Sequence, residues 1–336
     1  MRGFTWRSLL TLLAVLLVAV LVAGCGAKTT ADQKAAEQKA PEQKPAAGKK
    51  FLNIATGGTA GTYYPLGGAI AEILNKNIPG MNASAQSTGA SVANINMLKD
   101  GSVDVAFVQN DIAFYAANGT EMFKDKKVEG LKGLATLYPE TIQIVTLEKT
   151  GIKDIAGLKG KRVAVGAAGS GTEANARQIL EAYGITYKDI TAQYLSFAEA
   201  ANNLKDGNID AAFLTAGFPT AAIQDIAAQH KIVLLPVPAD KADNLIKKYP
   251  FYTKITIPAN TYPNQGKDVS TVAVRAMLAV TDKMDADLAY NIVKAIYSNL
   301  DRLQAAHATG KLITKATAGD GMSIPLHPGA EKYFKE

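Results

Sequence analysis

Residues 98–107 read LKDGSVDVAF, and residues 204–213, which lie 106 positions further along the chain, read LKDGNIDAAF. Each copy has the pattern of a helix end, a turn at glycine and an apolar strand. Upstream of each copy, a short apolar run leads through a glycine-rich turn into a helical pattern. The repetition predicts two lobes of similar construction.

The sequence around these copies alternates short β-branched runs with helical periodicity, which is typical of α/β proteins. From Phe51 to Glu336 the chain has 286 residues, which is comfortable for two domains. Strands are expected at residues 51–55, 83–87, 103–108, 162–165 and 209–214. Helices are expected at residues 65–74, 91–98, 172–183 and 220–228, with one long helix at residues 288–303.

The first 24 residues have the pattern of a secretory signal. Arg2 and Arg7 precede an apolar run at residues 9–23, which is shorter than the roughly 20 residues of a membrane span. The run ends VAGC, the pattern of a bacterial lipoprotein signal, so Cys25 is the expected lipidation site. The alternative is an uncleaved anchor helix with an incidental cysteine. Lipidation would hold the protein on the outer face of the cytoplasmic membrane, outside the cytoplasm.

Residues 25–50 are expected to form a disordered tether that begins with the lipidated cysteine. After Cys25 this segment has no large apolar side chain, and it is rich in Ala, Lys, Gln, Glu and Pro. Of the net charge of +6, the signal carries +2 and residues 26–50 carry +3, which leaves +1 for residues 51–336. The folded part therefore lacks the basic excess of a nucleic-acid-binding protein.

Cysteine and histidine usage argues against several kinds of chemistry. Cys25 is the only cysteine, so the chain can form neither an internal disulfide nor a thiolate cluster. His230, His307 and His327 are scattered, without the spacing of metal ligands or a visible nucleophile beside them. We expect no metal, no cofactor and no catalytic residues, and hence a protein that is not an enzyme.

A first glycine-rich segment, TGGTAGTYYP at residues 56–65, lies between an expected strand and an expected helix. Glycines let the backbone approach a ligand, and the free N–H groups at a helix start favour an anion. Thr59 and Thr62 add hydroxyl groups, and Tyr63 and Tyr64 add flat walls with a polar tip. The alternative is an ordinary strand-to-helix turn with capping residues.

A second glycine-rich segment, GAAGSGTE at residues 166–173, is close to a P-loop, but Thr172 stands where the phosphate-binding lysine belongs. Nucleotide hydrolysis is therefore not expected. What remains is an anion cradle of backbone N–H groups with the Ser170 and Thr172 hydroxyls, which would suit a carboxylate. An ordinary helix cap is the alternative.

Polar residues also follow the expected strands, where ligands of open α/β sheets bind. They are QSTG at residues 86–89, with Ser91 and Asn94 nearby, QND at residues 109–111, and TAG at residues 215–217. Any one of them could be turn chemistry. Glu140, Glu173 and Asp111 could each meet an amino group of a ligand, and the sequence does not choose among them.

Six segments together resemble the TAXI family, the extracytoplasmic solute receptors of TRAP-type transporters. The resemblance runs from about Phe51 to the carboxyl terminus. The segments are TGGTAGTYYPLGGA (56–69), QSTGASVAN (86–94), VDVAFVQND (103–111), GSGTE (169–173), DAAFLTAGFPT (210–220) and IPLHPGAEKYFKE (324–336).

The resemblance implies a type II periplasmic-binding-protein fold, with two α/β lobes, crossover strands and a ligand cleft between the lobes. Lobe 1 would comprise residues 51–148 and 257–336, and lobe 2 residues 149–256, with hinges near residues 147–149 and 253–257. It also implies a small carboxylate ligand such as glutamate, glutamine or 2-oxoglutarate, and a TRAP membrane permease as partner. We expect a monomer.

By the same resemblance, twelve residues are expected to contact the ligand. In the first lobe they are Thr59, Gly61, Thr62, Tyr63, Ser87, Gln109 and Asn110. In the second lobe they are Ser170, Gly171, Thr172, Ala216 and Gly217.

Three rival interpretations share this architecture. One is an enzyme such as porphobilinogen deaminase, which holds its cofactor through a cysteine; here the only cysteine, Cys25, lies outside the folded part. The second is a receptor subunit that reports its ligand to a signalling kinase. The third is the binding protein of an ATP-driven importer, which only the family resemblance disfavours.

Overall fold

A mixed sheet of ten strands organises residues 50–336, the part of the chain that the computed structural model describes. The strand order is β2-β1-β3-β10-β4-β7-β5-β6, while β8 pairs with β4 and β9 pairs with β10. The strands are β1 (Lys50–Ala55), β2 (Met81–Gln86), β3 (Val105–Gln109), β4 (Leu131–Leu147), β5 (Arg162–Ala164), β6 (Thr191–Gln193), β7 (Ala211–Ala216), β8 (Ile232–Leu235), β9 (Thr253–Ile257) and β10 (Val269–Thr281).

Helices pack against both faces of this sheet. In order they are α1 (Tyr63–Asn77), α2 (Ser91–Lys99), α3 (Asn110–Asn118), α4 (Gly171–Ala182), α5 (Phe197–Lys205), α6 (Ala221–Gln229), α7 (Ala239–Lys248), α8 (Ala286–Tyr297), α9 (Leu300–Ala306) and α10 (Pro328–Lys335). Among the α-helices of residues 50–336, none combines the length and the hydrophobicity that a membrane crossing requires.

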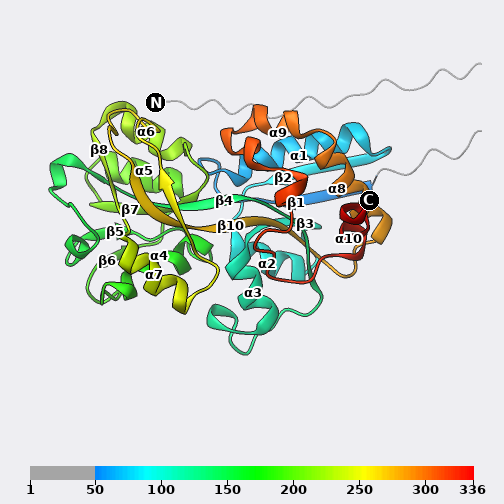
Figure 1. Ribbon diagram of the computed structural model, residues 1–336, viewed down its shortest axis with the longest axis horizontal. Helices are drawn as coiled ribbons and strands as arrows, with labels where there is room; N and C mark the ends of the chain where they lie inside the picture. Colours follow the sequence, from blue (N-terminus) through cyan, green and yellow to red (C-terminus); the bar gives the residue numbers. More distant parts are fainter. Residues whose placement is uncertain (1–49) are drawn as a thin grey trace, which may run out of the picture. The chain divides into compact units, whose positions relative to one another are not determined.

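Two long antiparallel strands, β4 and β10, join two groups of elements. Residues 276–279 of β10 pair with β3, whereas residues 269–273 pair with β9. Residues 141–146 of β4 pair with β7. We call β1–β3, α1–α3 and α8–α10 the first half, and β5–β9 with α4–α7 the second half. Figure 1 shows β4 and β10 running from one half into the other.

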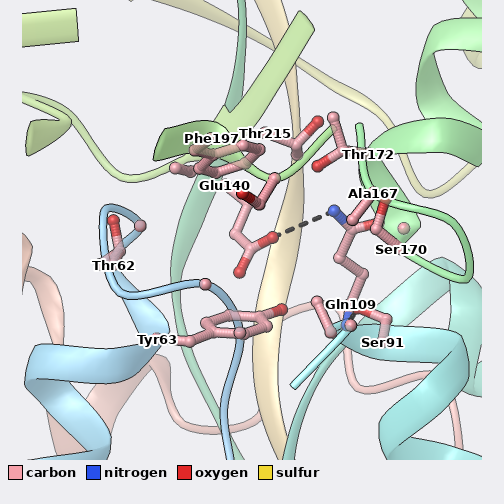
Figure 2. A pocket seen from close by; sticks show the side chains of 18 of the residues that line it. Thr62, Tyr63, Ser91, Gln109, Glu140, Ala167, Ser170, Thr172, Phe197 and Thr215 are labelled. Carbon is pink, nitrogen blue, oxygen red and sulfur yellow. Dashed lines mark hydrogen bonds between the residues drawn. The ribbon is translucent and has the colours of Figure 1, made fainter. Parts of the chain in front are cut away.

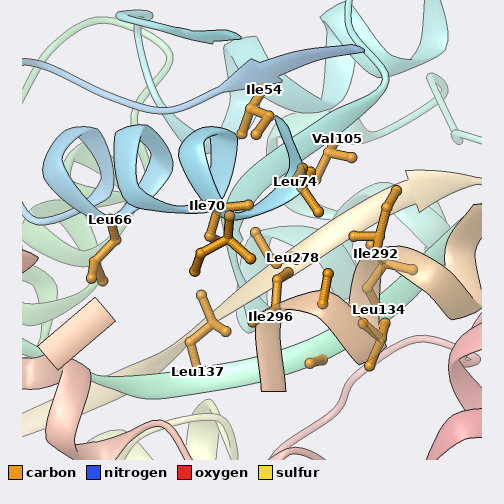
Figure 3. Close-up of a cluster of buried hydrophobic side chains, with 14 of the residues drawn as sticks. Ile54, Leu66, Ile70, Leu74, Val105, Leu134, Leu137, Leu278, Ile292 and Ile296 are labelled. Carbon is orange, nitrogen blue, oxygen red and sulfur yellow. The ribbon is translucent and has the colours of Figure 1, made fainter. Parts of the chain in front are cut away.

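Each half has its own apolar core. In the first half, α1 buries Leu66, Ile70 and Leu74 at the spacing of one helix face, and they pack in one cluster with Ile292 and Ile296 of α8 (Figure 3). Burying each such side chain contributes roughly 1.5–3 kcal/mol. In the second half, a separate cluster gathers side chains of α4, β5, β7 and α7. The chain beyond β10 is therefore needed to complete the core of the first half.

The repeat at residues 98–107 and 204–213 is also a repeat of structure. In both copies a helix ends before a glycine with positive φ, Gly101 at 73° and Gly207 at 75°. Asp104 accepts a hydrogen bond from the Asn53 amide at 2.7 Å, and Asp210 accepts one from the Arg162 amide at 2.8 Å. In each case the aspartate ties the following strand to its parallel neighbour.

The predicted strands and helices are found, with ends shifted by a few residues, except for the long helix at residues 288–303. That prediction is wrong, because α8 ends at Tyr297 and α9 begins at Leu300. Asn299 leaves helical geometry (φ −136°, ψ 40°), and its side-chain amide donates to the Ala295 carbonyl at 2.8 Å. An asparagine that bonds the preceding turn in this way competes with the helix ladder. The predicted signal, Cys25 and the tether up to residue 49 lie outside the described residues.

Candidate ligand-binding site

A pocket lies between the two halves, and both halves line it. The first half contributes residues 57–58, 61–63 and 88–91 with Gln109, and β4 contributes Tyr138 and Glu140. Facing them are residues 167, 170–172, 196–197 and 215–216 of the second half. The cavity volume is about 60 Å³. Since one water needs roughly 10–15 Å³ of cavity, the pocket suits a small molecule.

Several helices begin at the pocket wall. Tyr63 starts α1, Ser91 starts α2, Gly171 starts α4 and Phe197 starts α5, and all four line the pocket. At α4 the Ser170 hydroxyl accepts from the Glu173 amide at 3.2 Å, as a cap should. The first amides of a helix have no partner within the helix, and its dipole makes this end positive. The pocket is therefore suited to the negative group of a ligand.

Glu140 is the one acidic side chain among the residues that line the pocket. It is 2% exposed, and its Oε2 accepts from Gln109 Nε2 at 3.1 Å. Burial raises the pKa of Glu140 to about 8, against the lowering effect of the nearby Tyr63 hydroxyl and of the hydrogen bond from Gln109. No lysine, arginine or histidine lies among these described lining residues. Figure 2 shows Glu140 and Gln109 facing each other beside the Tyr63 ring.

Three buried polar atoms at the pocket lack a hydrogen-bond partner within the part of the chain that the structure describes. They are the Tyr63 hydroxyl, Gln109 Oε1 and the Thr215 hydroxyl. An unsatisfied buried polar group costs roughly 1–3 kcal/mol. Such groups are uncommon in native proteins, and three at one pocket indicate a place where a ligand supplies the missing partners.

The two halves touch on the sides of this pocket. The Gly169 carbonyl accepts from the amides of Val92 and Ala93 at 3.1 and 3.2 Å. On another side, Asn175 of α4 donates to Asp111 of α3 at 3.0 Å. These hydrogen bonds join the first half to the second on two sides of the pocket, so the structure is that of a closed cleft.

Eight of the twelve residues predicted as ligand contacts line the pocket: Gly61, Thr62, Tyr63, Gln109, Ser170, Gly171, Thr172 and Ala216. The other four lie outside its lining. Thr59 is exposed, and Ser87 donates to the Gly57 carbonyl at 3.0 Å. Asn110 bonds the Gly321 carbonyl and the Arg275 amide, and Gly217 packs on Thr309. As ligand contacts, all twelve remain predictions.

Of the three acidic residues that the sequence left open, only Glu140 lines the pocket. Asp111 is buried against Asn175, and burial raises its pKa to about 7. Glu173 accepts from the Tyr187 hydroxyl at 2.8 Å. A signal for Glu140 existed in the sequence, because it is the only acidic residue in the otherwise apolar and neutral run GLATLYPETIQIVTL at residues 133–147. Thr215, which the sequence placed among the polar residues at the strand ends, also lines the pocket, whereas Ser196 and Phe197 line it and were not predicted.

Within residues 50–336, no three His, Cys, Asp or Glu side chains are grouped so that they could hold a metal ion. The polar groups of the pocket are instead a carboxyl, an amide, hydroxyls and backbone N–H groups. They can bind and orient a small polar molecule.

Solved structures resemble this fold at low sequence identity. A protein of Bordetella bronchiseptica is 18% identical with a TM-score of 0.51, over 85% of this chain and 88% of that one. PhnD1 of Prochlorococcus marinus, solved with methylphosphonate, is 12% identical with a TM-score of 0.51, over 79% and 89%. The periplasmic aliphatic sulphonate binding protein SsuA of Escherichia coli is 18% identical with a TM-score of 0.47, over 85% and 78%.

These likenesses concern the fold alone. The two α/β halves, the two long connecting strands and the pocket between the halves are those of a periplasmic-binding-protein fold, as the sequence predicted. The sequence model of the NMT1-like family matches residues 54–336, which is most of the chain. The protein therefore belongs to the NMT1-like family.

Proposed function

We propose that the protein is an extracytoplasmic receptor that captures a small carboxylate between its halves and delivers it to a membrane permease. The observation that supports this proposal is the pocket, which both halves line. Three buried polar atoms at the pocket have no hydrogen-bond partner among the described residues, and a ligand could supply those partners. A ligand contacts both halves only in the closed form, so ligand binding would shift the protein towards that form. The PhnD1 structure, which holds methylphosphonate, is consistent with a small anionic ligand in this fold.

We further propose that the receptor belongs to the TAXI group and serves a TRAP permease, with glutamate, glutamine or 2-oxoglutarate as ligand candidates. The helix amino termini at the pocket support a carboxylate. The lobes would be residues 51–148 with 257–336, and residues 149–256, and they would move about β4 and β10. The pocket volume of about 60 Å³ favours the smaller candidates. A larger candidate would require the halves to close slightly less tightly.

The test is a thermal-shift screen of the full chain, after unfolding and refolding to remove ligand that copurifies. Amino acids, dicarboxylates, methylphosphonate and alkanesulphonates would be compared. A ligand at about 100 times its Kd adds roughly 2.7 kcal/mol, which raises Tm by several degrees. A shift with a carboxylate is the expected result. A shift confined to phosphonates or sulphonates would contradict the carboxylate class, and no shift with any compound would contradict the receptor function.

Anchoring through Cys25 is a separate proposal, supported by the VAGC pattern at residues 22–25. Cells fed a labelled fatty acid should incorporate the label into the wild-type protein and not into Cys25→Ser. Cell fractionation should place the wild type with membranes. Unlabelled wild-type protein would contradict the anchor without bearing on the pocket.

A further inference from the structure

The side-chain amide of Gln109 indicates what the ligand must offer. Gln109 Nε2 donates to Glu140 Oε2 at 3.1 Å, the orientation that suits an ionised carboxylate, which can only accept. Gln109 Oε1 is then a buried acceptor without a partner among the described residues, and it lies against Gly171. Glu140 and Gln109 Oε1 are therefore two neighbouring acceptors at the pocket wall.

The two acceptors need a donor that can serve both of them. A protonated amine has three N–H donors and a positive charge, and the hydroxyls of Tyr63 and Thr215 can accept as well as donate. Backbone amides at the starts of α1, α2 and α4 suit the opposite, negative end of the same molecule. A molecule with an ammonium group next to a carboxylate matches both sets.

None of the described side chains that line the pocket with Glu140 carries a positive charge, so the counter-charge for Glu140 must come from the ligand. Tyr63 of α1, Tyr138 of β4 and Asp111 of α3 are neutral or acidic. On β10, Val274 is opposite Glu140, and the next residue, Arg275, pairs with Asp320 at 2.9 Å outside the pocket lining. On β7, Thr215 and Ala216 are neutral. Closing the halves over Glu140 therefore requires a positive charge from the ligand or a proton.

We infer that the ligand carries a protonated amine with Glu140 as its counter-ion, so that the pocket selects α-amino acids over the matching 2-oxo acids. This inference rests on the receptor function proposed above. When the ligand lacks the amine, Glu140 must carry a proton in the closed form. The ratio of amino-acid affinity to 2-oxo-acid affinity therefore rises with pH, because only the amino acid can bind beside the ionised carboxyl.

The experiment measures Kd by calorimetry for two matched pairs, L-alanine with pyruvate and L-glutamate with 2-oxoglutarate, on the full chain. At about pH 9 we expect the amino acid to bind roughly 10²- to 10³-fold more tightly, the effect of leaving a buried charge unpaired. The ratio should shrink towards about pH 6, because a proton then neutralises Glu140. Equal or tighter binding of both oxo acids would overturn the inference and leave the receptor function standing.

Three variants separate specificity from folding. Glu140→Gln keeps an acceptor for Gln109 Nε2 and should fold, as its Tm would show, and it should lose the preference for the amino acid. Glu140→Asp keeps the charge and should retain that preference. Glu129→Gln changes an exposed glutamate paired with Lys127 and should behave as the wild type. A preference that survives Glu140→Gln unchanged would overturn the role of Glu140, and no binding of any of the four compounds would overturn both proposals.

Discussion

The two halves face the same pocket with different chemistry. The first half and β4 supply the large and ionisable side chains, namely Tyr63, Gln109, Tyr138 and Glu140. The second half supplies one large side chain, Phe197, and otherwise small neutral groups at residues 167, 170–172, 196 and 215–216.

This contrast indicates a division of work between the halves. A wall with a carboxyl, an amide and an aromatic ring can recognise a ligand before closure. A wall of small residues can approach closely and complete the enclosure, as Gly171 does against Gln109. If so, changes in the first half should alter which ligand binds and how binding depends on pH, and changes in the second half should alter closure.

The largest expected effect is the pH dependence of stability, which should come from the first half and β4. Burial raises the pKa of Glu140 to about 8 and that of Asp111 to about 7, whereas unfolded carboxyls titrate near 4. Their contribution to the unfolding free energy of the unliganded protein is therefore fully present below about pH 4 and is lost as pH rises through 7 and 8. The slope should reach about 1.4 kcal/mol per pH unit for each group.

Denaturant unfolding at a series of pH values checks this expectation. Glu140→Gln and Asp111→Asn should each give a flatter dependence than the wild type between about pH 5 and 8. Three identical curves would mean that neither carboxyl is protonated in the folded protein. An added amino-acid ligand should also flatten the wild-type curve, because its ammonium then replaces the proton on Glu140.

The next effect in size concerns closure by the second half. A Cβ on Gly171 would collide with Gln109 Oε1 across the pocket, so Gly171→Ala should obstruct the closed form and leave each half intact. Overpacking of this kind costs typically 1–3 kcal/mol, so Kd should rise roughly 10- to 10²-fold. Calorimetry gives Kd, and the Tm of the unliganded variant should stay close to that of the wild type.

Gly68→Ala is the matched control for this glycine. Gly68 lies inside α1, and a Cβ there would meet nothing within 4 Å. The substitution should leave Kd unchanged and raise stability by roughly 0.5–1 kcal/mol through helix propensity. Equal Kd values for the two alanine variants would show that the halves do not close onto Gln109.

The smallest expected effect is that of removing the Thr215 hydroxyl, and the Tyr63 hydroxyl on the other wall is its comparison. The Tyr63 hydroxyl has no partner among the described residues, so we expect it to bond the charged group of the ligand. Such a bond is worth roughly 1.5–3 kcal/mol, so Tyr63→Phe should raise Kd about 10- to 10²-fold. Thr215→Val removes a hydroxyl on the opposite wall, and Kd should rise about fivefold, the effect of roughly 1 kcal/mol. Equal losses in the two variants would contradict a division of work between the halves.

The fold could be predicted from the sequence because its signals are local. The repeat at residues 98–107 and 204–213 and the glycine-rich helix starts describe short segments whose turn chemistry is set by neighbouring residues. The exception, residues 288–303, has apolar periodicity strong enough to conceal the break at Asn299. That break depends on one side chain bonding the turn before it.

The site was predictable only where it consists of those same segments. Tyr63, Ser170 and Thr172 lie in the two glycine-rich segments between a strand and a helix, and they line the pocket as expected. Glu140 was one of three acidic candidates, and only the fold places it, and not Asp111 or Glu173, at the pocket. Phe197 reaches the pocket because separate elements meet in space, which sequence spacing does not show. Asn110 was predicted at the pocket because it follows Gln109, but at the start of α3 its side chain faces Gly321 and Arg275 instead.

The chain passes along β4 into the second half and returns along β10. This path also determines the order in which the two apolar cores can form during synthesis. A chain made from its amino terminus presents α1 early, but Ile292 and Ile296, which share its apolar cluster, come more than 200 residues later. The second half is contiguous in sequence and can bury its own core first. Until α8 is made, the apolar face of α1 in the nascent protein stays uncovered. We therefore expect aggregation and chaperone binding mainly in the interval before the last residues are made.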